Sequence, residues 1–261
     1  MSTQRAVVIG ISGCSSSGKT TLARLLRDIF PSTFILHEDD FYKPENQLPV
    51  KQGLVDWDCP EAISIPDMER ALLHVRATGE FPPDVDSKED QNSVGACPVT
   101  AEQVATVKAR VDDWLQRSPA RHALLAPEGG LAPYRLCLLD GFLLYTPAMA
   151  SVMRLIDIKL FLLVSRERAT QRREARDGYV TLEGFWKDPP GYVDKIVWPN
   201  YATAHSWLFR DGNVEGELDT GVLAETGIRA PLGHGLDVEM GKILNWAVDT
   251  IMQDLDVRFA S

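Results

Sequence analysis

The sequence predicts an α/β protein with a doubly wound parallel sheet. Short apolar runs of strand length alternate with helical patterns, the first run is rich in β-branched residues, and 44% of the 261 residues are hydrophobic. A β-branched apolar run is typical of a strand buried on both faces of a parallel sheet. A chain of this length can bury a large core, and we expect one domain over residues 1–261.

The expected elements follow one another in a regular order. Ala6–Ser12 is expected as the first strand. The leucines of Thr20–Phe30 recur at helical spacing, and Pro31 ends that helix. Further strands are expected at Phe34–His37, Arg135–Asp140, Asp157–Val164 and, more weakly, His205–Arg210. Helices are expected at Ala62–Ala77, Ala101–Gln116, Ser165–Arg176 and Leu236–Leu255.

Two segments interrupt this alternation. Residues 79–98 are rich in Pro, Asp and Glu, and residues 211–235 contain six glycines with little hydrophobic periodicity. Glycine- and proline-rich stretches between periodic segments are typical of loops. We therefore expect both segments to be surface insertions.

Charge and cysteine usage limit the classes of partner. A formal net charge of −10 argues against general nucleic-acid binding, which needs clustered Lys and Arg. The four cysteines form neither a CxxC pair nor a zinc-ligand spacing, so we expect a cytoplasmic protein. No apolar run approaches the ~20 residues that span a bilayer, and no signal-peptide pattern precedes the first strand. We expect a small-molecule partner, no nucleic acid, no membrane, and a monomer or weak homo-oligomer.

The segment Gly13–Thr20 matches the pattern G-x-x-x-x-G-K-[ST] in full, between an expected strand and an expected helix. Its two glycines let the backbone curl so that N–H groups face a phosphate, and the helix N-terminus adds the positive end of its dipole. Lys19 would contact the β and γ phosphates, and the Thr20 hydroxyl would bind Mg²⁺. The pattern predicts a P-loop NTPase fold that binds ATP with Mg²⁺, with phosphate contacts from Gly13, Cys14, Ser15, Ser16, Ser17, Gly18, Lys19, Thr20 and Thr21.

P-loop proteins include nucleotide-dependent switches as well as kinases. The sequence lacks the Asn-Lys-x-Asp pattern of GTPase switches, and its Asp-x-x-Gly at Asp188–Gly191 lies far from any expected strand end. A kinase needs a second carboxylate for the metal, a group that acts on the acceptor alcohol, and mobile cations. Each of these has a candidate, so a kinase is favoured and a switch is the less favoured alternative.

The carboxylate candidates follow expected strands. Asp140 ends an apolar strand, as a metal-site carboxylate beside a P-loop would; the alternative is a solvated strand-end aspartate. Asp39 and Asp40 follow Phe34–His37, and ligands of open α/β sheets bind beyond the carboxyl ends of strands. Adjacent residues of an extended segment point to opposite sides, so only one of the pair should face the acceptor as a base. The alternative is that both merely begin a loop.

The cation candidates lie on the expected helix Ser165–Arg176, where Arg172 and Arg173 each share a face with Arg176. This helix leads into a glycine- and proline-containing segment at residues 177–194 that is suited to a closing lid. We expect Arg172 and Arg176 to contact phosphate. The alternative is a solvated helix face.

Five blocks of the sequence have a pattern in common with a known family. The blocks are Gly10–Thr21, Asp39–Pro44, Asp140–Tyr145, Pro190–Tyr192 and Val197–Tyr201, and the Gly-Phe-Leu-Leu and Trp-Pro-x-Tyr motifs within them are the more specific parts. Together they resemble the nicotinamide riboside kinases, which are uridine kinase-like P-loop kinases. The resemblance implies ATP-dependent phosphorylation of the ribose 5′-hydroxyl of nicotinamide riboside, a step of NAD salvage.

The resemblance also implies roles for single residues at the phosphates. Asp39 is implied as the general base, with Lys19 and Thr20 at the phosphates and Mg²⁺. Asp140 is implied as the metal-site carboxylate, although the family more often carries Glu there. The shorter side chain favours a water-mediated metal contact. Arg176 is implied as a phosphate contact of the lid.

On the acceptor side, the resemblance places Trp57 against the nicotinamide ring and Asp58 at the ribose hydroxyls. The alternative is that Trp57 packs in the core and Asp58 caps a helix near Glu61. Arg173 is implied as the second sugar contact. Tyr179 is implied as the second stacking residue, a role for which Phe185 and Trp186 are alternatives. The runner-up function is that of a uridine/cytidine-type nucleoside kinase, which would use the same phosphate machinery.

Overall fold

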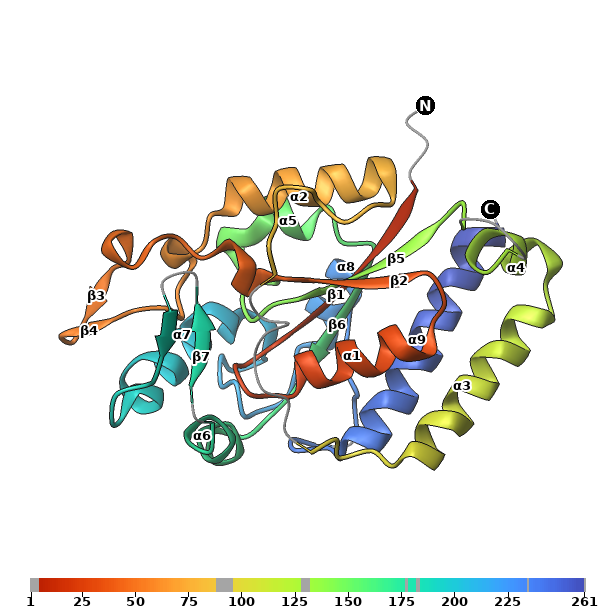
Figure 1. Ribbon diagram of the computed structural model, residues 1–261. Coiled ribbons are helices and arrows are strands. Elements are labelled where there is room, and N and C mark those ends of the chain that lie inside the picture. The colour runs from red at the N-terminus through yellow and green to blue at the C-terminus, as the bar shows by residue number, and fades with distance from the viewer. Residues whose placement is uncertain are drawn as a thin grey trace.

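The computed structural model describes residues 5–87, 96–127, 132–176, 178–181, 184–233 and 235–260, with the side chains of 179–181 and 260 left aside. A five-stranded sheet of order β2-β5-β1-β6-β9 lies at the centre, and all its strand pairs are parallel (Figure 1). The predicted α/β fold with a parallel sheet is confirmed. The strands are β1 (Ala6–Gly13), β2 (Thr33–His37), β5 (Arg135–Asp140), β6 (Ile158–Leu162) and β9 (Ile228–Arg229).

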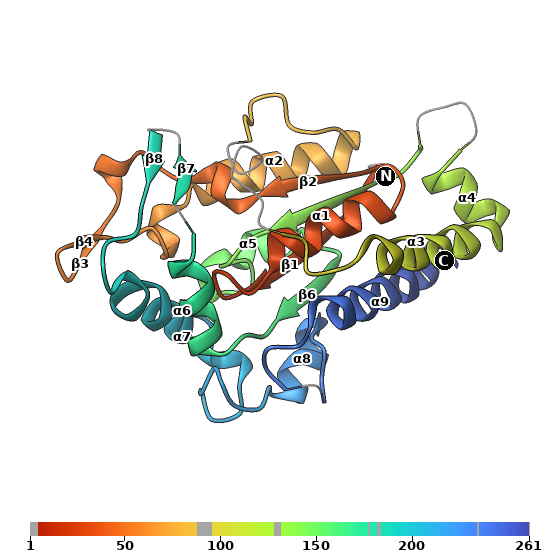
Figure 2. The same ribbon diagram turned by 60° about the horizontal axis from the view of Figure 1, so that its bottom comes forward.

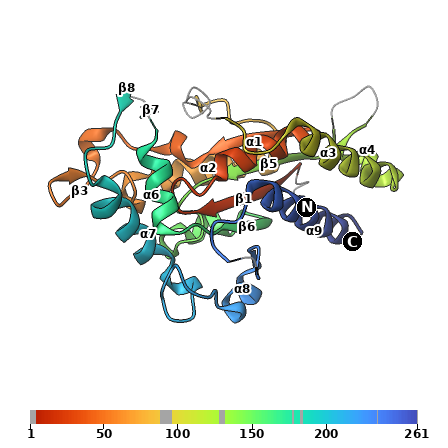
Figure 3. The same cartoon turned by 90° about the horizontal axis from the view of Figure 1, so that it is seen from below.

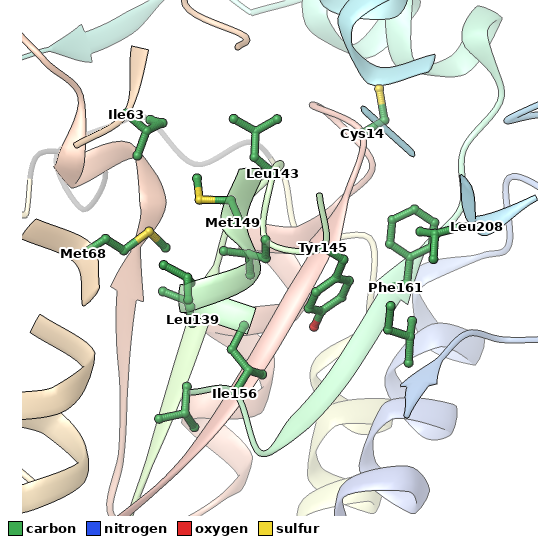
Figure 4. Close-up of a cluster of buried hydrophobic side chains, with 14 of the residues drawn as sticks. Cys14, Ile63, Met68, Leu139, Leu143, Tyr145, Met149, Ile156, Phe161 and Leu208 are labelled. Carbon is green, nitrogen blue, oxygen red and sulfur yellow. The ribbon is translucent and has the colours of Figure 1, made fainter. Parts of the chain in front are cut away.

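Helices cover both faces of the sheet, which explains why every residue of β1 is buried. On one face pack α2 (Ile65–Thr78) and α5 (Ala150–Met153), and Figure 4 shows part of that core, with Leu139, Tyr145 and Phe161 around the strands. The other face is covered by α1 (Lys19–Ile29), α3 (Ala101–Gln116), α4 (Pro119–Leu125) and α9 (Met240–Ala260). α3 and α9 contact each other, and Figure 3 shows both at the same end of the molecule as α4.

The helix ends follow local sequence signals. Thr100 and Gln103 form a capping box at the start of α3, in which each side chain binds the backbone N–H of the other residue. α2 ends at Gly79, whose φ of 75° is readily adopted by glycine. The start of α6 (Arg166–Glu174) is capped by the Ser165 side chain, which accepts a hydrogen bond from the Arg168 backbone N–H.

Smaller elements gather beyond the loop that joins β1 to α1. They are the hairpins β3 (Val50–Lys51) with β4 (Leu54–Val55) and β7 (Tyr179–Thr181) with β8 (Gly184–Trp186), together with α6 and α7 (Trp198–His205). Figure 2 shows α6, α7 and the β7–β8 hairpin grouped at this end of the molecule. The segment expected to form a lid, 177–194, contains this hairpin, although residues 177, 182 and 183 lie outside the described part of the chain.

Two expectations about elements were wrong. His205–Arg210 is not a strand: α7 ends at His205 and a 3₁₀ turn covers Ser206–Leu208, whose Leu208 is buried in the core. The fifth strand of the sheet is β9, which lies within 211–235 together with α8 (Thr220–Thr226). That segment is therefore part of the fold and not only a surface insertion. Of the other expected insertion, 79–98, residues 88–95 lie outside the described part, and the remainder holds neither helix nor strand.

Within the described ranges, no helix combines the length and the apolar composition needed to cross a membrane.

Candidate active site

The segment Gly13–Thr20 forms a tight loop between β1 and α1. Gly13 has a φ of 143°, and a Cβ there would lie 2.5 Å from the carbonyl oxygen of Leu162 in β6. Gly18 has a φ of 103°, and a Cβ there would lie 2.6 Å from Met240 Cε at the start of α9. Gly13 therefore needs glycine both for the backbone angle and for space, whereas Gly18 needs it for the backbone angle, since Met240 Cε is the end of a flexible side chain.

A pocket with about 500 Å³ of empty volume lies at this loop. Lys19 is buried, and its Nζ donates a hydrogen bond to the Cys14 carbonyl oxygen at 3.0 Å, which holds the ammonium group against the loop. The pocket brings the phosphate-loop, metal-site and base candidates into one space. It is lined by Ser15, Ser16, Gly18, Lys19, Thr20, Thr21, His37, Asp39, Asp140, Gly141, Phe142 and Arg176.

The side chains of Thr20 and Asp140 meet in this pocket. Thr20 Oγ1 donates to Asp140 Oδ2 at 2.5 Å, and His37 Nδ1 lies 3.3 Å from the same oxygen. Burial alone would raise the pKa of Asp140, but the hydrogen bond and charge of His37, with Lys19, bring that pKa below its usual value. A hydroxyl and an ionised carboxylate are oxygen ligands that suit Mg²⁺, which commonly completes its shell with phosphate oxygens and water. These two residues therefore fit a magnesium site.

Asp39 lines the pocket and Asp40 does not. Both lie in the 3₁₀ segment Glu38–Phe41, so their divergence arises from a helical turn and not from the extended backbone that we expected. The structure thus distinguishes the two aspartates by position, and only Asp39 is near the phosphate loop.

Sequence reasoning missed two residues directly before this pair. One is His37, the partner of Asp140, and the other is Glu38, whose Oε2 accepts a hydrogen bond from the Leu143 backbone N–H at 3.1 Å. Burial, reinforced by the charge of Asp39, raises the pKa of Glu38 well above its usual value. Their place at the end of β2 was a signal that they adjoin the site. Their partners are remote in sequence and could not be inferred.

Arg173 connects the phosphate loop to the acceptor side. Its Nη1 donates to Ser15 Oγ at 2.8 Å and to Asp58 Oδ1 at 2.9 Å, and its Nη2 donates to Asp58 Oδ2 at 3.2 Å. Both members of the Arg173–Asp58 pair are buried. The expectation that Asp58 might cap a helix was wrong, because the next 3₁₀ turn, Pro60–Ala62, has no side-chain cap and follows Cys59.

Asp188 is a further residue that sequence reasoning did not assign to the site. It accepts hydrogen bonds from Arg173 Nε at 2.6 Å and Nη2 at 3.2 Å, and from Trp186 Nε1 at 3.0 Å. The only signal in the sequence was that Asp188 lies in the proline- and glycine-containing segment that we expect to form a lid. Asp188 therefore fixes the Arg173 guanidinium and the Trp186 ring relative to one another.

Trp57 lies in an aromatic group between the acceptor side and the lid. Its ring centroid is 5.2 Å from that of Tyr42, in an edge-to-face arrangement, and 5.5 Å from that of Trp186. Trp57 is buried in a small hydrophobic cluster with lid residues, as the core-packing alternative expected. Of the three candidates for a second stacking ring, Trp186 contacts Trp57, Phe185 is exposed, and the side chain of Tyr179 is outside the described part of the chain.

The remaining phosphate candidates divide into two groups. Arg176 lines the pocket, whereas Arg172 Nη1 donates to the carbonyl oxygens of Ser16 at 3.2 Å and Ser17 at 3.4 Å and so supports the loop. Cys14 does not line the phosphate pocket: its side chain is buried in the hydrophobic core, part of which Figure 4 shows, and burial raises the pKa of its thiol to about 12. Cys14 can therefore contact phosphate only through its backbone.

Comparison with known proteins finds relatives whose sequences align with most of this chain. The chain is 34% identical over 253 residues to a nicotinamide riboside kinase of Schizosaccharomyces pombe, covering 97% of this chain and 99% of that protein. It is 33% identical over 221 residues to a nicotinamide riboside kinase of Saccharomyces cerevisiae, covering 84% and 85%. It is 30% identical over 210 residues to nicotinamide riboside kinase 2 of Mus musculus, covering 79% and 83%. No family model matches the chain.

Proposed function

We propose that this chain, which belongs to the nicotinamide riboside kinase family, transfers the γ-phosphoryl group of ATP to the ribose 5′-hydroxyl of nicotinamide riboside. The observation that carries the proposal is that the phosphate pocket adjoins a second pocket at Asp58. Ser15 and Phe142 line both of them. Transfer to a nucleoside alcohol requires this adjacency of a phosphate site and a sugar site.

Phosphoryl transfer depends on positioning and on charge stabilisation more than on covalent chemistry by the protein. We assign Lys19 and the loop N–H groups to bind the β and γ phosphates. Arg176, which lines the same pocket, is assigned to contact the phosphoryl group during transfer. Asp39 is the residue we assign to accept the proton of the 5′-hydroxyl as it attacks. Thr20 and Asp140 would hold Mg²⁺, which supplies positive charge at the phosphate oxygens.

Asp58 and Arg173 are assigned to the ribose. A carboxylate can accept hydrogen bonds from both vicinal hydroxyls, and a guanidinium can donate to their oxygens. In the structure the two groups already bind each other, at 2.9 and 3.2 Å. The ribose hydroxyls therefore contact a preformed ion pair, and they use the acceptor positions of Asp58 and the donor positions of Arg173 that remain available.

The base is assigned to the space between Trp57 and Trp186. Nicotinamide riboside carries a pyridinium cation, and a cation over an aromatic face is stabilised by roughly 0.5–2 kcal/mol, depending on desolvation. The two rings are in contact, with centroids 5.5 Å apart, so the β7–β8 hairpin has to move outward to admit a third ring. Such a movement is consistent with the closing lid that we expect at residues 177–194.

The experiment that tests the proposal is a nucleoside panel with Mg²⁺ and ATP, in which release of ADP is measured for nicotinamide riboside, nicotinic acid riboside, uridine and cytidine. We expect the highest kcat/KM with nicotinamide riboside, and we expect Trp57→Ala to weaken use of this cation more than use of uridine. A higher kcat/KM for uridine or cytidine in the wild type would assign the chain to pyrimidine nucleosides. Equal losses for both substrates in Trp57→Ala would contradict the stacking role.

Other features of the chain support the expected setting of this activity. Cys14, Cys59, Cys97 and Cys137 are free thiols, which suits a reducing compartment such as the cytoplasm. The net charge of −10 is consistent with a small-molecule partner held locally by the phosphate loop and the arginines of α6. We propose ATP and Mg²⁺ as the cofactors of a monomer or weak homo-oligomer.

A further inference from the structure

A small pocket lies directly behind Asp58, on the side where α7 passes the phosphate loop. It is nearly closed, with room for about one water-sized group, and is lined by Cys14, Ser15, Asp58, Phe142, Leu143, Val197, Tyr201 and His205. Because Ser15 and Phe142 also line the phosphate pocket, the two pockets adjoin each other. A nucleoside whose 5′-hydroxyl lies near Asp39 would place its sugar toward this second pocket.

Two residues that line this pocket each carry a buried polar atom with no hydrogen-bond partner among the described residues: Tyr201 Oη and His205 Nε2. Tyr201 is 5% exposed and His205 is fully buried, with ring centroids 4.8 Å apart on successive turns of α7. A buried polar atom without a partner is costly, so it usually has a function or a ligand. Two of them beside Asp58 indicate a site that is completed by a polar group from outside the chain.

The protonation state of His205 defines what this pocket can bind. His205 Nδ1 lies 3.1 Å from the Tyr201 carbonyl oxygen, to which only a protonated nitrogen can donate. Burial lowers the pKa of His205 to about 4, so the imidazole is neutral near pH 7. Its Nε2 is therefore an acceptor, and the neighbouring Tyr201 hydroxyl can donate or accept.

Resting on the function proposed above, we propose that Tyr201 and His205 recognise the ribose 2′-hydroxyl and so make the enzyme selective for ribonucleosides. Each sugar hydroxyl is both a donor and an acceptor. Asp58 can accept from the hydroxyls but cannot donate to them, and it already accepts two hydrogen bonds from Arg173. Tyr201 supplies a donor and His205 supplies a further acceptor at the same place.

The test compares a ribonucleoside with its 2′-deoxy counterpart in Tyr201→Phe and in His205→Asn. The first variant removes only the hydroxyl. The second keeps an amide N–H that can replace the Nδ1 donor but lacks the Nε2 acceptor. We expect each variant to lower kcat/KM for the ribonucleoside by roughly 3- to 10-fold, the worth of one neutral hydrogen bond, and to leave the deoxynucleoside unchanged. The loss should be mainly in KM, and binding of the ribonucleoside measured by calorimetry should weaken by the same factor.

Tyr145→Phe is the matched control, because the Tyr145 hydroxyl is also buried but donates to the Gly10 carbonyl oxygen, away from the sugar. Any change that it causes in kcat/KM should be equal for the ribonucleoside and the deoxynucleoside. Tyr201→Phe should not lower the thermal stability of the free protein, since no hydrogen bond of that hydroxyl is lost. Equal losses with ribo- and deoxynucleoside, or no loss in either variant, would overturn the inference.

The choice of substrates also distinguishes a failure of this inference from a failure of the proposed function. Nicotinamide riboside and its 2′-deoxy analogue are used first, and uridine with 2′-deoxyuridine are used if the wild type prefers pyrimidines. Preference for uridine would overturn the proposed substrate while the ribose selectivity could still be measured. Activity with nicotinamide riboside but unchanged selectivity in both variants would overturn only the role of Tyr201 and His205.

Discussion

At the scale of single residues, Asp39 and Asp40 are neighbours in sequence with different positions in the molecule. Only Asp39 lines the phosphate pocket. We expect Asp39→Asn to lower kcat by about 10²-fold or more, because general-base catalysis contributes typically 10²–10⁴-fold, and to leave ATP affinity nearly unchanged. Steady-state kinetics and ATP titration measure the two quantities. Asp40→Asn is the matched control, and a larger loss of kcat in that variant would show that the base is Asp40.

Glu38 provides a second prediction at this scale. It is fully buried, and burial raises the pKa of its carboxyl well above the usual value. As the pH rises above about 4.3, the unfolded chain releases this proton while the folded protein keeps it. The unfolded state is thereby favoured, and the folded protein loses stability until the pH passes the folded-state pKa.

We therefore expect Glu38→Gln, which preserves an oxygen for the Leu143 N–H, to gain stability relative to wild type as the pH rises above about 4.3 and toward the folded-state pKa of Glu38. Thermal melts across this range measure the gain. Glu225→Gln, at an exposed position of α8, is the control and should give melting temperatures parallel to those of wild type. Parallel profiles for Glu38→Gln as well would mean that Glu38 does not titrate as inferred.

Several site residues were predicted from sequence because their roles depend on local patterns. Lys19 and Thr20 follow from the loop motif, and Asp140 follows from its place at a strand end. His37, Asp188 and Tyr201 were missed as site residues because their roles depend on partners or pockets formed by distant segments. Local spacing carries no information about such contacts.

At the scale of elements, the Arg173 guanidinium holds the lid, the phosphate loop and the Trp57–Asp58 segment together. We expect Arg173→Ala to raise KM for the nucleoside by 10-fold or more and KM for ATP much less, since hydrogen bonds to charged groups are worth about 1.5–3 kcal/mol. Initial rates over both substrates measure the two constants.

Arg172 provides the comparison on the same helix, because it binds only carbonyl oxygens of the phosphate loop among the contacts described above. Arg172→Ala should raise KM for ATP more than KM for the nucleoside. If Arg173→Ala instead raised KM for ATP as much as KM for the nucleoside, the division of roles along α6 would be wrong. Melting temperatures of both variants identify any loss of folding.

Most elements were predicted correctly, and the errors have physical causes. The buried strands and α3 were found because periodicity and capping act locally. The stretch around Trp207, Leu208 and Phe209 resembles a strand in composition, but it is apolar because a 3₁₀ turn packs it into the core. β9 has two residues, too few for a period to be recognised, and its place in the sheet is set by pairing with β6.

At the scale of the whole molecule, the sheet order places β1 between β5 and β6, so the strand that carries the phosphate loop has its neighbours much later in the chain. This arrangement puts the loop at the centre of the carboxyl edge, with Asp39 and Asp140 following the two adjacent strands on one side. It also lets α6 and α7 reach the loop from beyond β6. The residues that we assign to catalysis and to the sugar are thus drawn from several separate segments of the chain.

The central position of β1 has a consequence for synthesis of the protein. Ala6 pairs with Arg135, Ile9 pairs with Ile158, and Met240 of the last helix lies against Gly18. While the chain is still emerging from the ribosome, β1 has neither of its neighbouring strands, because both are encoded in the second half of the sequence. β1 can take its place in the sheet only after β5 and β6 have been synthesised. The proposed cofactor ATP, although assigned to the N-terminal motif, can therefore stabilise only chains that extend past β6.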